Sequence, residues 1–457
     1  MKRKNIYFVA TIIALAGFIF SYDSANLGGS VKYLREYFNI PADKVGILVI
    51  ASLIGNFTGS LFAGYFSDLI GRKKTLIFAI SLGIIGLSIT ILSKSLILFY
   101  VGRIIFGISL GSLFVAAPMY IVEVSPASKR GRTGAIRQIL LAFGLILGYS
   151  VTYFFERAFS LQWNTMTGWR VLIGIEILFL IFMFLAFFTL SESPRWLIMK
   201  RRDQEAKTSL SEFIDNPERV ELVYSEMISN RPKQSENKKI KIKGGLIYAL
   251  LICAIFPIFR QLSGVNAITY YAQRIFSNIS KGGSNLAYFQ SIFIGVSELG
   301  GAIFVVIFAD KMGRKVLLLM GVLGMFFSES LVTYFLYIQK IDIDVSYLIY
   351  VYNFFFTISA GAMLTVYISE VVPTVIRSKG SSLSGMLNWI TDAIVIYSFP
   401  LINTNIYLTE RFHGSFSFGI FSVSMFLFFI VILFLPETKG KTLEEIAIYW
   451  KTKGDWE

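Results

Sequence analysis

The sequence predicts an all-α membrane protein with twelve transmembrane helices in two pseudo-symmetric six-helix bundles. Of the 457 residues, 55% are hydrophobic and 16% are charged, whereas a soluble domain averages about 25% charged residues. The apolar residues gather in runs of about 20, the length at which a helix crosses the hydrocarbon core. A set of polar motifs also occurs once in each half of the chain, which is typical of membrane proteins built from two repeated bundles.

The apolar runs define the expected spans, with boundaries good to about 2–4 residues. The spans are 6–28, 45–67, 75–93, 97–122, 134–156, 169–190, 245–276, 286–309, 316–338, 346–371, 379–402 and 415–435. The chain then divides into an N-terminal bundle (1–191), a cytoplasmic linker with short helices (192–244), a C-terminal bundle (245–435) and a cytoplasmic tail (436–457).

Basic residues give the expected orientation. Most of the 43 Lys and Arg residues fall in segments on the same side as the N-terminus, which the positive-inside rule makes the cytoplasmic side. Both termini are therefore expected in the cytoplasm and the chain in the cell membrane. The net charge of +14 then needs no nucleic-acid partner. The first span follows Met1-Lys-Arg-Lys, but it is too long for a signal peptide and is expected to be retained.

Residue counts also exclude several classes of function. The single cysteine, Cys253, rules out an internal disulfide, and the single histidine, His413, rules out a multi-histidine metal site. The sequence contains no nucleophile–base set, metal-ligand cluster or nucleotide-binding loop. We therefore expect neither an enzyme nor a bound metal or cofactor.

Three pairs of polar motifs recur where apolar segments end. Tyr120-Ile-Val-Glu123-Val-Ser-Pro126 returns as Tyr367-Ile-Ser-Glu370-Val-Val-Pro373. Asp68-Leu-Ile-Gly71-Arg72-Lys73 returns as Asp310-Lys-Met-Gly313-Arg314-Lys315. Ser191-Glu192-Ser-Pro-Arg195 follows the sixth span, and Pro436-Glu437-Thr-Lys439-Gly follows the twelfth. Chance similarity between apolar helices does not produce matched polar motifs at matched boundaries, so the two halves are repeats.

Together with Gln261-Leu-Ser-Gly264-Val-Asn266, these motifs resemble those of the major facilitator superfamily, and within it the sugar porter family. The resemblance covers nearly the whole chain. It implies a major facilitator fold and a secondary active transporter, monomeric in the lipid bilayer, that moves a hexose, pentose or polyol by alternating access with proton symport. A carrier of a charged organic solute and a passive sugar uniporter are the alternatives.

The resemblance implies a cytoplasmic gate of charged residues at helix ends, which holds the halves together while the site faces outward. These residues could instead only mark topology, but acids beside bases in both copies favour a gate. The gate residues are Asp68, Arg72, Glu123, Arg130 and Glu192, then Asp310, Arg314, Glu370, Arg377 and Glu437.

Three charged residues inside the first-half spans are the candidates for proton coupling. In the resembled family, the residues at the positions of Asp23 and Arg103 face each other, and proton-coupled members carry an acid at the position of Asp23. A neighbouring guanidinium controls whether such a carboxyl holds a proton; a purely structural salt bridge is the alternative. Glu176 is either a proton relay or an acid at a helix contact.

The resemblance also implies a set of sugar-binding residues, in which amides offer donors and acceptors to hydroxyl pairs. They are Phe20, Gln138, Gln261, Asn266, Tyr271, Asn388 and Trp389. We add Arg260, Glu298 and Asp392, which stand where the family commonly has amides. Either these three charges compensate one another around a neutral sugar, or the substrate is charged.

Overall fold

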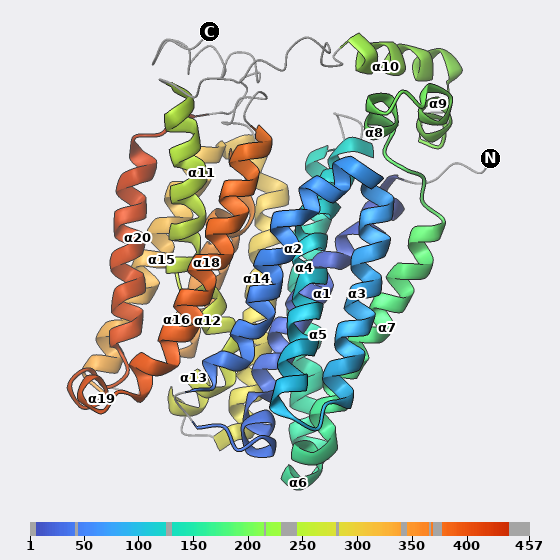
Figure 1. Ribbon diagram of the computed structural model, residues 1–457. Helices are drawn as coiled ribbons and strands as arrows, with labels where there is room; N and C mark the ends of the chain where they lie inside the picture. The colour runs from blue at the N-terminus through green and yellow to red at the C-terminus, as the bar shows by residue number, and fades with distance from the viewer. Residues whose placement is uncertain are drawn as a thin grey trace.

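The computed structural model describes residues 6–41, 44–124, 130–213, 216–229, 245–279, 283–339, 345–364, 367–368 and 377–437. All regular secondary structure in these residues is helical, and the long helices stand side by side in two groups (Figure 1). Eleven helices of the described residues are long and apolar enough to cross a membrane. The chain is therefore an all-α, multi-pass membrane protein.

The first group, here called the first bundle, is formed by α1 to α7. Its helices are α1 (Ile6–Tyr37), α2 (Gly46–Ile70), α3 (Arg72–Leu92), α4 (Leu96–Val124), α5 (Arg130–Ala158), the short α6 (Leu161–Trp163), the π-helix η3 (Asn164–Gly168) and α7 (Trp169–Phe188).

The second bundle is formed by α11 to α20. It contains α11 (Gly245–Leu262), α12 (Val265–Tyr270), α13 (Ala272–Ile279), α14 (Gly283–Met312), α15 (Arg314–Tyr337), α16 (Ser346–Phe356), the π-helix η4 (Thr357–Met363), α18 (Arg377–Thr404), α19 (Ile406–Phe412) and α20 (Phe416–Leu433). The expected tenth span, 346–371, begins as α16 and η4 and runs on into residues that lie partly outside the described ranges. The bundles meet where α14 packs on α5 and α18 packs on α2.

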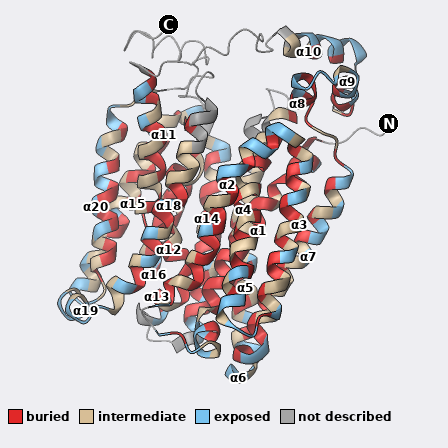
Figure 2. Cartoon of the chain, viewed as in Figure 1, coloured by how far each residue is buried: buried red, intermediate tan, exposed pale blue. Residues whose placement is uncertain are grey.

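Burial follows from lipid on the outside and helix contacts on the inside. Buried positions line the faces between helices, and exposed positions face outward (Figure 2). Large apolar side chains such as Leu178, Phe182, Leu185 and Ile394 are more than half exposed. Such a surface would be costly in water, but in a bilayer the surrounding lipid is as apolar as these side chains.

Short helices follow α7, as the sequence predicts: α8 (Pro194–Met199), α9 (Asp203–Ser211) and α10 (Pro217–Ser229). They lie beyond one end of the first bundle (Figure 1). Trp196, Leu210, Val220 and Tyr224 form a small apolar core of their own, separate from the core of the bundles. The segment is therefore folded over these residues and does not act there as a plain tether.

The seventh expected span, 245–276, is broken. α11 ends at Leu262, Gly264 adopts a left-handed conformation with φ +76°, and α12 begins at Val265. Glycine reaches this conformation at little steric cost. A β-carbon at this position would also lie 2.2 Å from the Phe421 ring. The break thus depends on glycine for two independent reasons, and it separates α11 from the short helix that carries Asn266.

We expect Gly264→Ala to destabilise the second bundle, because the left-handed backbone alone costs about 1–2 kcal/mol and the ring contact adds to it. The measurement is the thermal unfolding midpoint of detergent-purified protein. Gly419→Ala is the control, since a β-carbon there meets only ordinary contact with Thr333. Equal midpoints for the two variants would contradict this account of the break.

Candidate functional site

A cavity of about 1000 Å³ lies between the two bundles. It is lined from the first bundle by Phe20 and Gln138 and from the second by Asn266, Glu298 and Asn388, all of which the sequence singled out. It extends to Asp68, at the end of the molecule that carries α8 to α10. Polar groups from both bundles thus converge on one space that is large enough for a small solute.

Amide side chains form a connected cluster on the second-bundle side. Asn388 Oδ1 accepts hydrogen bonds from Arg260 Nη1 at 2.8 Å and from Gln261 Nε2 at 3.0 Å. Asn266 Nδ2 donates to Asp392 Oδ2 at 2.8 Å and to Gln261 Oε1 at 3.3 Å. Gln261 and Asp392 are 1% exposed and do not line the cavity. They hold the cavity-lining amides in place from behind.

Arg260 makes no direct ion pair with Glu298 or Asp392. Among the described residues, no carboxylate oxygen lies within 4.0 Å of its guanidinium, and its Nε has no hydrogen-bond partner. The guanidinium instead lies over the Phe356 ring, 5.7 Å from its centroid. Glu298 and Asp392 attract it only from a greater distance. One interpretation of these charges was that Arg260 pairs directly with Glu298 or Asp392. The structure does not contain such a pair.

The aromatic candidates take three different places. Phe20 lines the cavity. Trp389 lies behind Phe20, with ring centroids 5.8 Å apart, and its Nε1 donates to Ser60 Oγ across the bundle interface at 2.8 Å. Tyr271 lies away from the central cavity, stacked on Phe399 beside a smaller cavity of about 280 Å³. In this conformation Tyr271 is therefore too distant to contact a solute in the central cavity.

The bundles are closed against each other at the end opposite to α8–α10. A β-carbon on Gly28 would lie 2.5 Å from the Tyr270 carbonyl oxygen. Tyr288 Oη donates to Gly29 O at 3.0 Å, and Tyr149 Oη donates to Thr269 O at 2.7 Å. All of these contacts join α1 or α5 to the second bundle. The cavity is therefore open toward one end of the molecule and sealed toward the other.

A buried ion pair lies in the first bundle. Arg103 donates from Nη1 to Asp23 Oδ1 at 2.7 Å and from Nη2 to Asp23 Oδ2 at 2.9 Å, and Asp23 and Arg103 are 1% and 0% exposed. Two parallel bonds are the strong geometry for this pair. Glu176, also fully buried, accepts from Asn26 Nδ2 at 3.4 Å. The sequence thus identified three charges that the structure gathers in one place.

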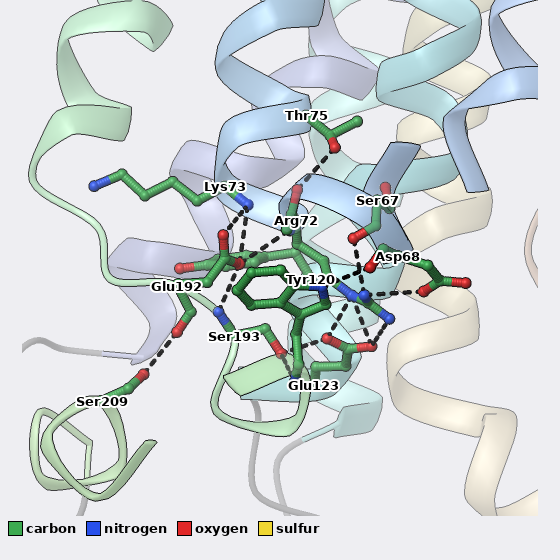
Figure 3. A network of polar contacts seen from close by, with 12 residues as sticks. Ser67, Asp68, Arg72, Lys73, Thr75, Tyr120, Glu123, Glu192, Ser193 and Ser209 are labelled. Carbon is green, nitrogen blue, oxygen red and sulfur yellow. Dashed lines mark hydrogen bonds and ion pairs between the residues drawn. The ribbon is translucent and has the colours of Figure 1, made fainter. Parts of the chain in front are cut away.

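A second charged cluster lies at the α8–α10 end of the first bundle (Figure 3). Arg72 is 3.0 Å from Asp68 Oδ1 and 3.0 Å from a Glu123 carboxylate oxygen. Ser193 Oγ also donates to Glu123. These bonds all lie within the first bundle and its following loop, so in this conformation they tie α2, α3 and α4 together.

Glu192 completes this cluster by capping α3. Its carboxylate accepts from the backbone N–H groups of Arg72 at 3.0 Å, Lys73 at 3.1 Å and Ser193 at 2.8 Å (Figure 3). A negative charge at a helix N-terminus is stabilised by the unpaired N–H groups there. Burial nevertheless raises the pKa of the Glu192 carboxyl, and the backbone donors only partly offset that effect.

The second bundle repeats this cap. Glu437 accepts from the backbone N–H groups of Arg314 at 3.2 Å and Lys315 at 3.1 Å, at the start of α15. Tyr120 Oη donates to Ser191 O, and Tyr367 Oη donates to Pro436 O. Gly71 and Gly313 have matching φ values of +102° and +95°. Of the remaining gate candidates, Glu370 lies outside the described residues. The side chains of Arg130, Asp310 and Arg377 also lie outside what the structure describes.

Two charged residues of the bundles were missed in the sequence. Arg137 on α5 lines the central cavity beside Gln138. Glu329 on α15 is 1% exposed, and neither carboxyl oxygen has a hydrogen-bond partner among the described residues. Both stand inside expected spans, where an ionisable side chain is a functional candidate by default. That rule, applied to every span, would have found them.

The fold and the cavity between two repeated bundles define a secondary transporter of the major facilitator type. Residues 9–450 match the family described as sugar (and other) transporter. The match covers nearly the whole chain, and the chain belongs to this family, whose members are transporters and not enzymes.

Individual relatives agree with this assignment. The D-xylose-proton symporter of Escherichia coli (strain K12) is 29% identical over 98% of this chain and 96% of its own length. The arabinose-proton symporter of Bacillus subtilis (strain 168) is 28% identical over 97% of this chain and 95% of its own. A solved structure of the proton:xylose symporter XylE, bound to 6-bromo-6-deoxy-D-glucose, superposes with a TM-score of 0.84 at 28% identity, over 97% of this chain and 99% of that one.

Removing one partner of the Asp23–Arg103 pair should be more damaging than removing both. Arg103→Leu leaves an unpaired carboxylate in an apolar bundle and should cost about 3–5 kcal/mol. Asp23→Asn combined with Arg103→Leu removes that charge and should recover part of the loss. The measurement is the thermal unfolding midpoint. Arg157→Leu, on the exposed end of α5, is the control. A double variant no more stable than Arg103→Leu would contradict the pairing.

Proposed function

We propose that this protein is a proton-coupled symporter of a sugar or sugar derivative. The observation that carries the proposal is the buried Asp23–Arg103 pair, which lies beside the inter-bundle cavity. Ser24, the neighbour of Asp23, lines that cavity and donates to Tyr270 Oη of the second bundle at 3.1 Å. Movement between the bundles would thus act directly on the segment of α1 that carries the acid.

The pair offers a simple route to proton coupling. While Arg103 donates to both carboxylate oxygens of Asp23, the ionised carboxylate is stabilised and binding a proton is unfavourable. If Arg103 is drawn away, a lone carboxylate is left in an apolar bundle, and binding a proton removes that unpaired charge. Glu176 lies close enough to accept or pass on the proton within the same buried cluster. The alternative of a passive uniporter would leave this costly arrangement without a role.

The sugar site we propose consists of the cavity-lining groups Phe20, Gln138, Asn266 and Asn388, with Gln261 and Asp392 holding the amides in place. Gln138 presents both a donor and an acceptor to sugar hydroxyls, Asn266 presents its Oδ1, and Asn388 presents its Nδ2, which has no partner among the described residues. Phe20 supplies an apolar surface for a ring face. Relatives named for xylose, arabinose and glucose support a monosaccharide-sized cargo.

We further propose that the α8–α10 end is cytoplasmic, together with both termini, and that the protein works as a monomer in the cell membrane. The cavity reaches that end, so this conformation is inward-facing. The bundles 1–191 and 245–435 would rock about the fixed site. Asp68, Arg72, Glu123, Glu192, Arg314 and Glu437, together with Arg130, Asp310, Glu370 and Arg377, would form the gate that closes the cytoplasmic side.

Transport in proteoliposomes tests the proposal. An inward proton gradient should drive uphill uptake of the cargo, and Asp23→Asn should abolish accumulation while sparing exchange across the membrane, because exchange requires no net proton movement. Glu410→Gln on the exposed α19 is a matched carboxyl-to-amide control. Uphill uptake that persists in Asp23→Asn would remove Asp23 from the coupling mechanism, and uptake that ignores the gradient would exclude symport.

A further inference from the structure

Two arginines from opposite bundles line the central cavity. Arg137 is on α5 of the first bundle, and Arg260 is on α11 of the second. They are close enough for their like charges to repel each other across the cavity. Two guanidinium groups facing one space are an unusual lining for a site that would bind only neutral hydroxyls.

Arg137 has no counter-charge in the part of the chain that the structure describes. Among the described residues it makes no hydrogen bond and no ion pair, and its one recorded contact of this kind is with the Phe114 ring, 5.3 Å from the centroid. A guanidinium within a membrane bundle is expensive unless it is paired or hydrated. Arg260 donates to the neutral Asn388 through Nη1, and its Nε is buried, but its Nη2 forms no hydrogen bond among the described residues. The Arg137 guanidinium and the Arg260 Nη2 are therefore the donors left for a ligand.

The nearby acids do not neutralise these arginines directly. Glu298 lines the cavity but forms no ion pair with either arginine among the described residues. Asp392 is bonded to Asn266 behind the cavity wall. Asp68, at the open end, is paired with Arg72. An anion placed between Arg137 and Arg260 would thus bind donors that no carboxylate of the described chain occupies.

We propose that the cargo is an acidic sugar, such as a hexuronate, whose carboxylate binds between Arg137 and Arg260. This rests on the proposed function as a symporter. Two guanidinium groups match the planar carboxylate, which accepts paired N–H donors. The hydroxyls are left for Gln138, Asn266 and Asn388. A phosphate ester would offer its negative oxygens on a tetrahedral group instead of a planar one, so it is the competing anion in the test.

An acidic cargo changes the electrical balance of transport. One proton moving with one monoanion carries no net charge, whereas one proton moving with a neutral sugar carries one positive charge. Uptake of a hexuronate should therefore follow the pH gradient and be insensitive to an imposed membrane potential. Uptake of a neutral sugar by the same route would be accelerated by an inside-negative potential.

The test is uptake into proteoliposomes that contain the full-length protein. D-glucuronate, D-glucose, D-xylose and D-glucose 6-phosphate are compared, first as direct substrates and then as competitors. We expect D-glucuronate to bind at least about tenfold more tightly than D-glucose, since charge-assisted hydrogen bonds differ from neutral ones by that order. We also expect its uptake to be driven by the pH gradient at zero membrane potential.

Variants assign the effect to the two arginines. Arg137→Gln and Arg260→Gln should each raise the KM for D-glucuronate by about tenfold or more and lower the preference for D-glucuronate over D-glucose. Arg137→Lys retains the charge and should lie in between. Arg157→Gln makes the same change on the exposed end of α5 and should have no effect. Folding is checked by the thermal unfolding midpoint of each variant.

The outcomes separate this inference from the function on which it rests. Gradient-driven uptake of D-glucose or D-xylose with no competition by D-glucuronate would overturn the acidic cargo and leave the symporter intact. Preference for D-glucose 6-phosphate would overturn the carboxylate. If no sugar, acidic or neutral, accumulates with the proton gradient, the proposed function itself fails. Selectivity for D-glucuronate that survives both arginine-to-glutamine changes would overturn the assignment to Arg137 and Arg260.

Discussion

The cost of placing charge inside an apolar helical bundle organises this molecule. Asp23 and Arg103 meet that cost with two parallel hydrogen bonds and almost no exposure. The amides around Arg260 meet it only in part. Arg137, which has neither a partner nor a cap among the described residues, faces the cavity, where water or cargo can reach it, whereas Glu329 is buried away from it. Arg137 thus marks the site, and Glu329 stays outside it.

The internal repeat has a local physical meaning. In each half a glutamate that follows the last helix of the bundle caps the start of that bundle's third membrane span, α3 or α15. In each half a tyrosine hydroxyl fixes the backbone just before that glutamate. The recurring polar motifs therefore make the same contact in each half: they bind the end of a six-helix bundle to its third membrane span. This explains why the motifs recur when the helix interiors do not.

The sequence was sufficient for the fold because long apolar runs and turn glycines are local signals. The capping motifs were visible because they recur in both halves, although the caps they form join residues 120 and 123 positions apart. Gly71 and Gly313 turn the chain where expected. The sequence could not show that Arg260 bonds Asn388 and not Glu298. That choice depends on how α11, α14 and α18 pack, at a precision of ångströms, and hydrophobic periodicity does not give positions to that precision. Nor could it separate Tyr271, next to the break after α12, from the cavity that Asn266 lines. Arg137 and Glu329 lie inside expected spans, but the sequence pattern did not distinguish them from the other charged residues, and neither was predicted as a site residue.

The break at Gly264 has a mechanical consequence. Tyr352 Oη donates to Ser263 O at 2.7 Å, and Tyr149 of the first bundle donates to Thr269 O in α12. Both carbonyls are thus held by tyrosine side chains, one on each side of the break. α12 lies against α1, while α11 packs against α18. Along this path, a movement of the first bundle reaches α11 through a single left-handed residue and a few hydroxyls, a joint much softer than a continuous helical rod, while the α5–α14 and α2–α18 contacts carry the rest.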